Sequence, residues 1–254
     1  MAGMGMNLAA RGLIVLAGAL LVATTGTGTA FAQTSEAAQG TEAQGKLTLG
    51  RYASSDGNTA LDANLRGTWG VHTAWVGVYR DKAGLQQWRA GYDHHFDSDL
   101  VRSVLSLQNA SGGAWVGSAS AEVGGKSYAI VGWGRTNLRN YINLNYDPND
   151  AITLGLGTRA LQGMELALFQ VRDDRLHTGQ RVTHWLLRRH FDNEQRLTLD
   201  FFTKRGLTSD DAFVRTRSLT VGYDRGPLFV RFTHDPHAGF TSPTQNRLSL
   251  GSRF

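Results

Sequence analysis

The last ten residues of the chain alternate between apolar and polar side chains up to the final residue. Leu248, Leu250 and Phe254 share one parity, whereas Arg247 and Arg253 share the other. A period of two residues is typical of a β-strand with one apolar and one polar face. A strand at the end of a chain has an open edge unless it pairs on both sides, and closure of the sheet into a barrel removes that edge. The C-terminus therefore favours an all-β fold with a closed sheet.

The same alternation recurs from residue 46 onward, in short segments separated by turn residues. Gly, with 31 residues, is frequent and Pro, with 4, is rare, which suits a chain of many strands and tight turns. No segment keeps a period of 3.6 residues, so the sequence predicts no long helix. The fifteen alternating segments are 46–52, 63–69, 73–80, 87–96, 101–108, 115–123, 127–136, 140–146, 151–159, 164–172, 181–191, 196–204, 217–223, 228–234 and 245–254.

The polar parity of these segments indicates a membrane barrel rather than a soluble β-sandwich. It is rich in Gly, Ser, Thr, Asn and Arg, whereas the exposed face of a soluble sheet is typically rich in Lys and Glu. Strands of a transmembrane barrel present alternate residues to lipid and to the lumen. The sequence therefore predicts an all-β fold, a transmembrane antiparallel up-and-down β-barrel.

The C-terminal segment resembles the closing strand of Gram-negative outer-membrane β-barrels, in which a C-terminal Phe heads an alternating series that the insertion machinery reads. This resemblance implies that Phe254 is an insertion signal that faces lipid. It also implies a protein of the bacterial outer membrane, with outer-membrane lipid, lipopolysaccharide and the barrel-insertion machinery as partners. A second layout is similar to the YaiO-type outer-membrane barrel family and implies the same location and no catalytic residues; it comprises 128–133, 146–148, 154–159 and 187–191.

The connections between segments fall into two classes of length. Short periplasmic turns and longer external loops are typical of outer-membrane barrels. Tight turns are predicted at 97–99, 124–125, 147–150, 192–194 and 224–227, and longer loops at 54–62, 207–213 and 235–244. An interfacial girdle on the periplasmic side is expected from the aromatic residues beside the tight turns, namely Tyr92, Phe96, Tyr146, Phe191 and Tyr223, together with Phe254.

The number of strands does not follow directly from the fifteen segments. A bacterial single-chain barrel with both termini on the periplasmic side has an even number of strands. If all tight turns lie on one side, segment 164–172 can run neither up nor down the barrel. It then continues the preceding strand through a bulge or lies in an external loop, or the region 173–180 contains a further strand. We expect about fourteen strands, with twelve or sixteen as the alternatives.

The N-terminus has the features of an export signal. One apolar run, 12–24, follows Arg11 and precedes the small-residue sequence Ala-Phe-Ala at 30–32. Such a run is typical of a secretory signal peptide with cleavage after Ala32, and it is short for a membrane span. The absence of Cys excludes a disulfide framework and a lipidated N-terminal Cys. The predicted organisation is a signal peptide, a flexible periplasmic leader and an outer-membrane barrel, at 1–32, 33–45 and 46–254.

Arginines on the inward parity give the main functional lead. Guanidinium groups crowded in a pore raise the local positive potential and favour anionic solutes. The acids on the same parity are few, chiefly Asp93, Glu122, Glu165 and Asp200. The alternative is that arginines and acids cross-link the wall and fill a narrow lumen. The predicted lumen-lining residues are Arg66, Arg89, Arg102, Arg159, Arg188, Arg196, Arg231, Arg247 and Arg253.

Histidines and acids occur together at two places, but neither predicts a metal site. His94 and His95 are neighbours on one predicted strand, so they face opposite sides and cannot share a metal without a bulge. His234 and His237 belong to a polar loop. The chain contains no G-x-S-x-G or H-x-S-N motif of a barrel enzyme. We therefore predict no metal, no cofactor and no catalytic residue.

The predicted function is a channel or an export or transport pore with a positively biased lumen, for an anionic solute or polysaccharide. Two alternatives stay open: an outer-membrane surface enzyme acting on lipid or lipopolysaccharide, and a structural or adhesion barrel. The net charge of +5 is mild, and an exported protein rarely meets nucleic acid, so a nucleic-acid partner is not expected.

Overall fold

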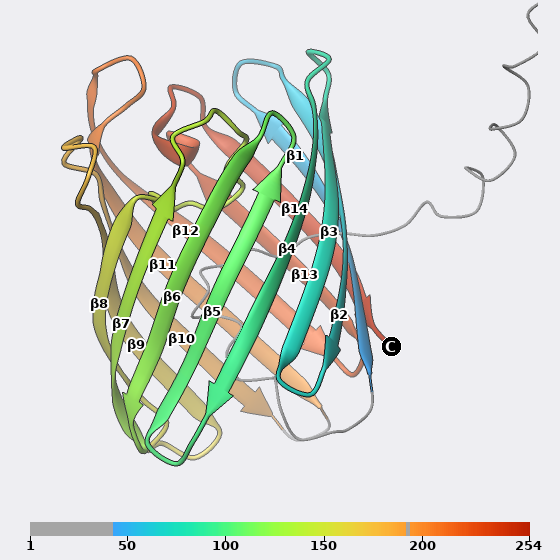
Figure 1. Ribbon diagram of the computed structural model, residues 1–254, viewed down its shortest axis with the longest axis vertical. Coiled ribbons are helices and arrows are strands. Elements are labelled where there is room, and N and C mark those ends of the chain that lie inside the picture. The colour runs from blue at the N-terminus through green and yellow to red at the C-terminus, as the bar shows by residue number, and fades with distance from the viewer. Residues whose placement is uncertain (1–42, 192–193) are drawn as a thin grey trace, which may run out of the picture.

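The computed structural model describes residues 43–191 and 194–254, which form one closed antiparallel β-barrel of fourteen strands (Figure 1). Each strand pairs with its neighbours in sequence, as in an up-and-down barrel. No helix within these ranges is long and apolar enough to cross a membrane. The strands are β1 (Gln44–Ser54), β2 (Thr59–Trp69), β3 (His72–Asp81), β4 (Gln86–Asp97), β5 (Val101–Ala110), β6 (Ala114–Gly124), β7 (Ser127–Thr136), β8 (Ala151–Thr158), β9 (Met164–Asp173), β10 (Arg181–Phe191), β11 (Gln195–Leu207), β12 (Phe213–Arg225), β13 (Leu228–Asp235) and β14 (Gln245–Arg253).

The first and last strands close the sheet. Lys46 lies opposite Arg253, and the register continues to Ser54 opposite Gln245. Beyond β14, Phe254 donates its N–H to the carbonyl of Gly45 at 2.9 Å and accepts the N–H of Gly45 at 2.5 Å. The predicted fold, an antiparallel transmembrane-type barrel with fourteen strands, is therefore confirmed, and the C-terminal strand is the closing strand.

Fourteen strands are present, but one predicted strand is wrong. Segment 140–146 is not a strand, and it lies in a long connection, 137–150, between β7 and β8. Segment 164–172 is instead a regular strand, β9. The sequence 140–146 alternates because its apolar side chains, among them Leu144 and Tyr146, pack against the barrel wall from inside. A period of two residues marks two-sided packing of an extended chain, whether or not the chain pairs in a sheet.

The barrel has two distinct rims. The C-terminus lies at one rim, and we call this the terminus-side rim (Figure 1). Its connections are 70–71, 98–100, 125–126, 159–163 and 226–227. The opposite, loop-side rim carries 55–58, 82–85, 111–113, 137–150, 174–180, 208–212 and 236–244. The predicted tight turn 147–150 is therefore on the wrong side, because it is the end of the loop that enters the barrel.

Some predicted boundaries lie outside the described residues. The signal peptide 1–32, most of the leader 33–45 and the first two residues of the turn 192–194 are not described. Strand β1 begins at Gln44, two residues before the predicted start of the barrel.

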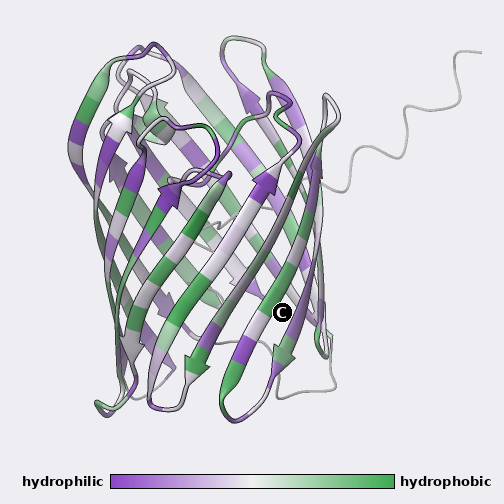
Figure 2. Ribbon diagram, turned by 60° about the vertical axis from the view of Figure 1, so that its left-hand side comes forward, coloured by the Kyte–Doolittle hydropathy of each residue, from purple (hydrophilic) through white to green (hydrophobic). Residues whose placement is uncertain are grey.

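The outer wall of the barrel is apolar. Large hydrophobic side chains project from almost every strand, and Leu61, Leu154 and Leu156 are each more than half exposed. Apolar and polar residues alternate in bands along the strands (Figure 2). Exposed aromatic side chains near the terminus-side rim include Tyr92, Phe96, Phe191, Tyr223 and Phe254. Tyr146, predicted to join this girdle, is buried inside the barrel because its loop folds inward.

The interior of the barrel is packed rather than empty. One side, along β7 to β10, holds an apolar cluster that includes Tyr128, Ile130, Phe169 and Leu186. Buried charged residues occur beside this cluster, as with Glu165 and Arg188, and also on the opposite side, as with Asp62 and Arg89. Interior-facing positions of small barrels are filled by side chains in this way. The inner surface is therefore the part of the molecule where function has to be sought.

Candidate functional site

The nine arginines predicted to line the lumen all have the parity of the buried, inward-facing residues of their strands or strand ends. Seven of them form ion pairs with inward-facing carboxylates. Arg102 is the loosest, with 3.8 Å between its Nε and Oδ1 of Asp97 at the exposed terminus-side rim. These ion pairs neutralise much of the arginine charge. That the nine arginines line an open channel stays a prediction.

A five-residue network joins β6, β7, β9 and β10 near the terminus-side rim. Arg159 lies 2.6 Å from Oε2 of Glu122 and 2.8 Å from Oε1 of Glu165. Arg188 donates to Oε2 of Glu165 at 2.8 Å, and the hydroxyl of Tyr128 donates to Oε1 at 2.6 Å. Burial alone would lower the pKa of Arg159, but the hydrogen bond to Glu122 and the charge of Glu165 outweigh it and raise that pKa. The network holds the wall together and leaves both charges of each pair neutralised.

The opposite wall repeats this arrangement. Arg89 donates to Oδ1 of Asp62 at 2.8 Å, and the hydroxyl of Tyr52 lies 3.2 Å from Oδ2 of the same carboxylate. Arg66 donates to Asp93 at 3.1 Å, and Ser106 also donates to Asp93. Every group in this cluster has a partner of opposite charge or a hydroxyl, as buried charges require.

Asp224 of β12 links β11 with β14 on the inner wall. It pairs with Arg196 of β11 and lies 3.5 Å from Arg253 of β14. Asp62 and Asp224 are absent from the four acids expected inside, although the strict alternation of β2 and β12 was a signal that could have found them. The interior therefore contains more acidic side chains than the four expected from the sequence.

Two of the nine arginines differ from the others in their contacts. Arg247 donates to the carbonyl of Leu144 at 3.2 Å, and its guanidinium lies 4.9 Å from the ring centre of Tyr52. Arg231, on β13, faces Gly222 and Ser249 on the neighbouring strands. Arg231 forms no ion pair with a carboxylate within 4.0 Å among the described residues. Arg231 is therefore the predicted arginine whose contact with a solute is considered below.

Loop 137–150 crosses the interior and reaches the far wall. The side chain of Gln87 on β4 forms two hydrogen bonds with the backbone of Ile142, at 2.7 Å to its N–H and 3.0 Å to its carbonyl. The side chain of Leu144 packs in a cluster with Tyr52 and Tyr79. This loop connects β7 and β8, so these contacts span the barrel. The loop narrows the bore at this level.

A buried histidine fastens the same loop to a third part of the wall. His184 on β10 is fully buried, and its Nε2 lies 2.9 Å from Asp147 of the loop. Its Nδ1 lies 3.0 Å from both carboxylate oxygens of Asp200 on β11. The imidazole is stacked between Phe169 and Phe202, with ring centres 4.6 and 5.0 Å away. Both ring nitrogens face carboxylates, which favours the doubly protonated imidazolium.

The loop-side rim contains another buried ion pair. Nζ of Lys204 lies 2.5 Å from Oδ1 of Asp235, and the same ammonium donates to the carbonyl of His237 at 2.8 Å. Ser218 donates to the same Asp235 oxygen at 2.6 Å. Loop 236–244 is therefore tied to the inner wall. The side chains of Lys204 and Asp235 are almost fully buried, so this pair is structural rather than a contact for solutes.

The remaining inner wall, along β5 to β7, is lined by small side chains. The inward positions Ser106, Ser118, Ser120 and Gly132 are only partly buried, whereas Gly134 lies directly against the backbone of Asn149 in loop 137–150. Short side chains leave room where long ones would fill it. The wall around Ser106, Ser118, Ser120 and Gly132 is therefore the candidate border of a passage.

The histidine pair expected to face opposite sides does so. His95 lies inside, 3.5 Å from the hydroxyl of Thr73, whereas His94 faces outward and packs against His72 and Phe96. Within the described ranges, no group of three or more His, Cys, Asp or Glu residues could hold a metal ion. His234 is hydrogen-bonded to Asn246, and His237 to the carbonyl of Thr241.

The barrel can be compared with solved structures. Omp33 of Acinetobacter baumannii, an outer membrane protein, superposes with a TM-score of 0.53 at 11% identity, over 85% of this chain and 100% of that chain. The fold is that of an outer-membrane β-barrel. Two further outer-membrane barrel folds align at TM-scores too low to carry an argument: a mutant of the Rh. blastica porin (0.45, 11% identity, 84% of this chain and 99% of that chain) and the NanC porin (0.47, 6% identity, 82% and 98%).

The comparisons with sequences give no closer relationship. No family model matches this chain, and no curated protein matches it. The resemblance to the YaiO-type family is therefore not confirmed, whereas the broader resemblance to outer-membrane barrels is confirmed at the level of the fold.

Proposed function

We propose that this protein resides in the bacterial outer membrane and forms a narrow passage for small solutes, with loop 137–150 as the element that sets its width. The apolar outer wall suits a barrel surrounded by lipid, because exposure of an apolar surface of this extent to water is energetically unfavourable. Closure of the sheet by β1 and β14 satisfies every strand edge, which a bilayer requires.

One observation supports the passage more than any other, namely the attachment of the internal loop to three separate parts of the wall. Gln87, Arg247 and His184 hold the loop at β4, β14 and β10. A loop placed across a barrel divides the bore and leaves only part of it open. The partly buried small residues of β5 to β7 border that part. A passage of this kind admits solutes of low mass and excludes folded chains.

The preference of this passage for anions depends on few residues. Most of the predicted arginines are paired with carboxylates, so their contribution to the potential is small. Arg231, which forms no ion pair among the described residues, carries what remains. We therefore propose a modest anion preference rather than a strongly basic lumen.

Conductance in a planar bilayer tests the passage directly. The wild-type protein should show small, stable single-channel steps. Replacement of residues 140–146 by a Gly-Ser linker of equal length should raise the conductance severalfold, because it removes Leu144 and Tyr146 from the bore. The matched control replaces the exposed residues 209–212, which leave the bore unchanged. A folded barrel with no conductance in either form would overturn the proposal and favour a structural barrel or a surface enzyme.

A further inference from the structure

Four arginines form a row across four neighbouring strands on the outer wall. Arg181 of β10 lies directly opposite Arg172 of β9 and Arg205 of β11, and Arg205 lies opposite Arg215 of β12. They lie near the loop-side ends of these strands, on the parity of the exposed residues. We call Arg172, Arg181, Arg205 and Arg215 the arginine row.

Like charges at directly opposite positions are unfavourable in a sheet, because their Cβ atoms are only about 5 Å apart. None of the four arginines forms an ion pair with a carboxylate among the described residues. Arg135 on β7 shows the contrast, since it binds both oxygens of Asp174 at 2.8 and 2.7 Å and stacks on Trp133. The arginine row is therefore a concentration of positive charge that lacks an anionic partner in the part of the chain that the structure describes.

Polar side chains continue the same surface below the arginine row. Thr203 lies opposite Thr183 on β10 and Arg217 on β12, and Gln170 donates to the hydroxyl of Thr183 at 3.0 Å. Arg217 adds a fifth exposed guanidinium. A groove of about 490 Å³ lies over these strands, and Arg181, Arg205, Arg215 and Arg217 line it together with the polar side chains. The groove offers both charge and neutral hydrogen-bonding groups to an anion.

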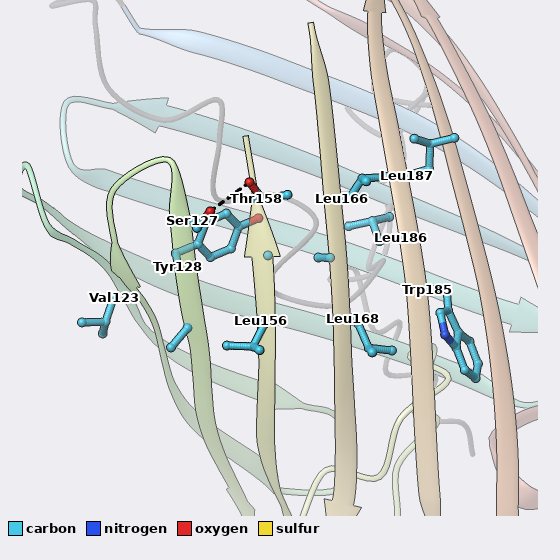
Figure 3. A pocket seen from close by; sticks show the side chains of 13 residues that line it. Val123, Ser127, Tyr128, Leu156, Thr158, Leu166, Leu168, Trp185, Leu186 and Leu187 are labelled. Atoms are coloured by element: carbon cyan, nitrogen blue, oxygen red, sulfur yellow. Dashed lines mark hydrogen bonds between the residues drawn. The ribbon is translucent and has the colours of Figure 1, made fainter. Parts of the chain in front are cut away.

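An apolar surface begins one row further from the rim. Trp185 lies opposite Leu168 and Phe201, and its ring packs against that of Phe201 at 5.5 Å. Trp185 also lines a second groove, of about 790 Å³, whose outward walls are mostly leucines with a valine and an alanine, and whose far end holds the hydrogen-bonded hydroxyls of Ser127 and Thr158 (Figure 3). Figure 3 shows Leu156, Leu168 and Trp185 along this groove. The polar and apolar grooves therefore meet at Trp185.

We propose that this surface binds a phosphorylated glycolipid of the outer leaflet, with its phosphates on the arginine row and its acyl chains in the apolar groove. Three strand spacings span about 14 Å, which is enough for more than one phosphate. Guanidinium groups bind phosphate oxygens bidentately and neutralise them. A ligand that carried charge alone would leave the adjoining apolar groove exposed, and an uncharged lipid would leave the arginine row without counter-charge.

The location of the surface agrees with such a ligand. The arginine row lies at the loop-side rim, opposite the rim that holds the C-terminus, and the longer loops of outer-membrane barrels face outward. The inference rests on the membrane location proposed above, but not on the passage. Lipid binding and conductance are separate measurements, so failure of one leaves the other intact.

Native mass spectrometry of the purified protein in detergent tests the inference. The probes are diphosphorylated lipid A, phosphatidylethanolamine and inorganic phosphate, each titrated into the same protein. The wild-type barrel should retain lipid A and neither of the other two. In the Arg205→Gln/Arg215→Gln variant the apparent affinity for lipid A should fall by about tenfold or more, since two charge-assisted contacts are lost.

The matched control is Arg51→Gln/Arg80→Gln, which removes two outward arginines that both lie opposite Leu61 and outside the row. This control should bind lipid A like the wild type. Equal affinity of the row variant and the wild type would overturn the inference, as would equal retention of phosphatidylethanolamine. Retention of inorganic phosphate at the same concentrations would also overturn it, because the site would then be an anion site without lipid specificity.

The row variant also offers an independent readout. Removal of like charges at opposite positions should leave its unfolding temperature in lipid-free detergent unchanged or higher. Addition of lipid A should then raise the unfolding temperature of the wild type but not that of the variant. A similar rise in both proteins would contradict the assignment of the arginine row.

Discussion

His184 of the barrel wall and Asp147 of the internal loop are joined across 2.9 Å, between the imidazole Nε2 and the carboxylate Oδ1. Loop 137–150 does not pair with any strand of the described barrel. This contact attaches it to β10 of the barrel wall. The imidazole also contacts Asp200, so a single side chain connects the loop with two strands.

Replacement of this histidine by Phe should release the loop. His184→Phe keeps a ring between Phe169 and Phe202 but leaves the carboxylates of Asp147 and Asp200 without their partner. Loss of one member of a buried charged group costs about 3 kcal/mol or more of unfolding free energy. Urea unfolding in detergent measures the loss, and bilayer recordings should show larger or fluctuating conductance. The control His234→Ala removes an exposed imidazole and should change neither quantity.

Buried and exposed carboxylates of the inner wall should contribute very different amounts to the free energy of unfolding. Glu165→Gln leaves Arg188 almost fully buried beside a neutral amide, so we expect about 3 kcal/mol of destabilisation. Asp97→Asn removes only the exposed pair with Arg102 and should change the free energy of unfolding by less than about 0.5 kcal/mol. Equilibrium unfolding of both variants provides the comparison. Equal effects would show that the Glu165 network does not support the wall.

Anion preference should depend on Arg231. Arg231→Gln removes an inward positive charge that has no carboxylate neighbour within ion-pair distance among the described residues. The reversal potential in a salt gradient should therefore move towards the non-selective value. Arg188→Gln is not a suitable control because it disrupts the wall, but Arg225→Gln on the exposed face of β12 is. An unchanged reversal potential in Arg231→Gln would remove the basis for anion preference.

The last residue should affect assembly more than stability. Phe254 is 72% exposed and joins Gly45 at the barrel seam. Deletion of Phe254 should lower the amount of folded barrel in outer-membrane fractions, whereas Phe254→Tyr should largely preserve it. The heat-dependent shift of folded barrels on gels gives the folded fraction. Normal accumulation after deletion would show that this residue is not an insertion signal.

The orientation of the barrel can be tested with single cysteines, since the native sequence has none. Ser209→Cys lies in the exposed connection 208–212 at the loop-side rim, and Ser98→Cys lies at the terminus-side rim. A membrane-impermeant maleimide should label the first on whole cells and the second only after the envelope is opened. The reverse pattern would invert the proposed topology.

The architecture could be predicted from the sequence because segments such as β11 and β14 alternate strictly with a period of two residues, which is compatible with a strand but not with a helix. Loop 137–150 could not be predicted from the sequence, because Leu144 and Tyr146 alternate with Asn just as strand residues do. Only the lack of a neighbouring strand to pair with distinguishes this segment from a strand. Cross-linking of the wall by arginines and acids is one of the two sequence-based alternatives, but the sequence does not predict which residues pair. Asp224 meets Arg196 and Arg253 across three strands, and parity shows which face a residue occupies but not its neighbours across the sheet.

The outward arginines were also missed. The charge expected to act on a solute has the inward parity, whereas Arg205 and Arg215 have the outward parity. Their importance appears only with the cross-strand register, because two residues at positions 205 and 215 become direct neighbours when β11 pairs with β12. Register depends on turn lengths and strand ends, which sequence patterns define poorly.

The seam between Gly45 and Phe254 sets an order of events for the molecule. The partner of β1 on one side is β14, the last strand of the barrel in sequence order, so the sheet cannot close before β14 has been synthesised. Until then β1 keeps an open edge that can pair with foreign strands. Contacts between strands so far apart in the sequence also form slowly, because they close a long loop. Closure of this barrel is therefore a single late event, and β1 is its most exposed edge until that event.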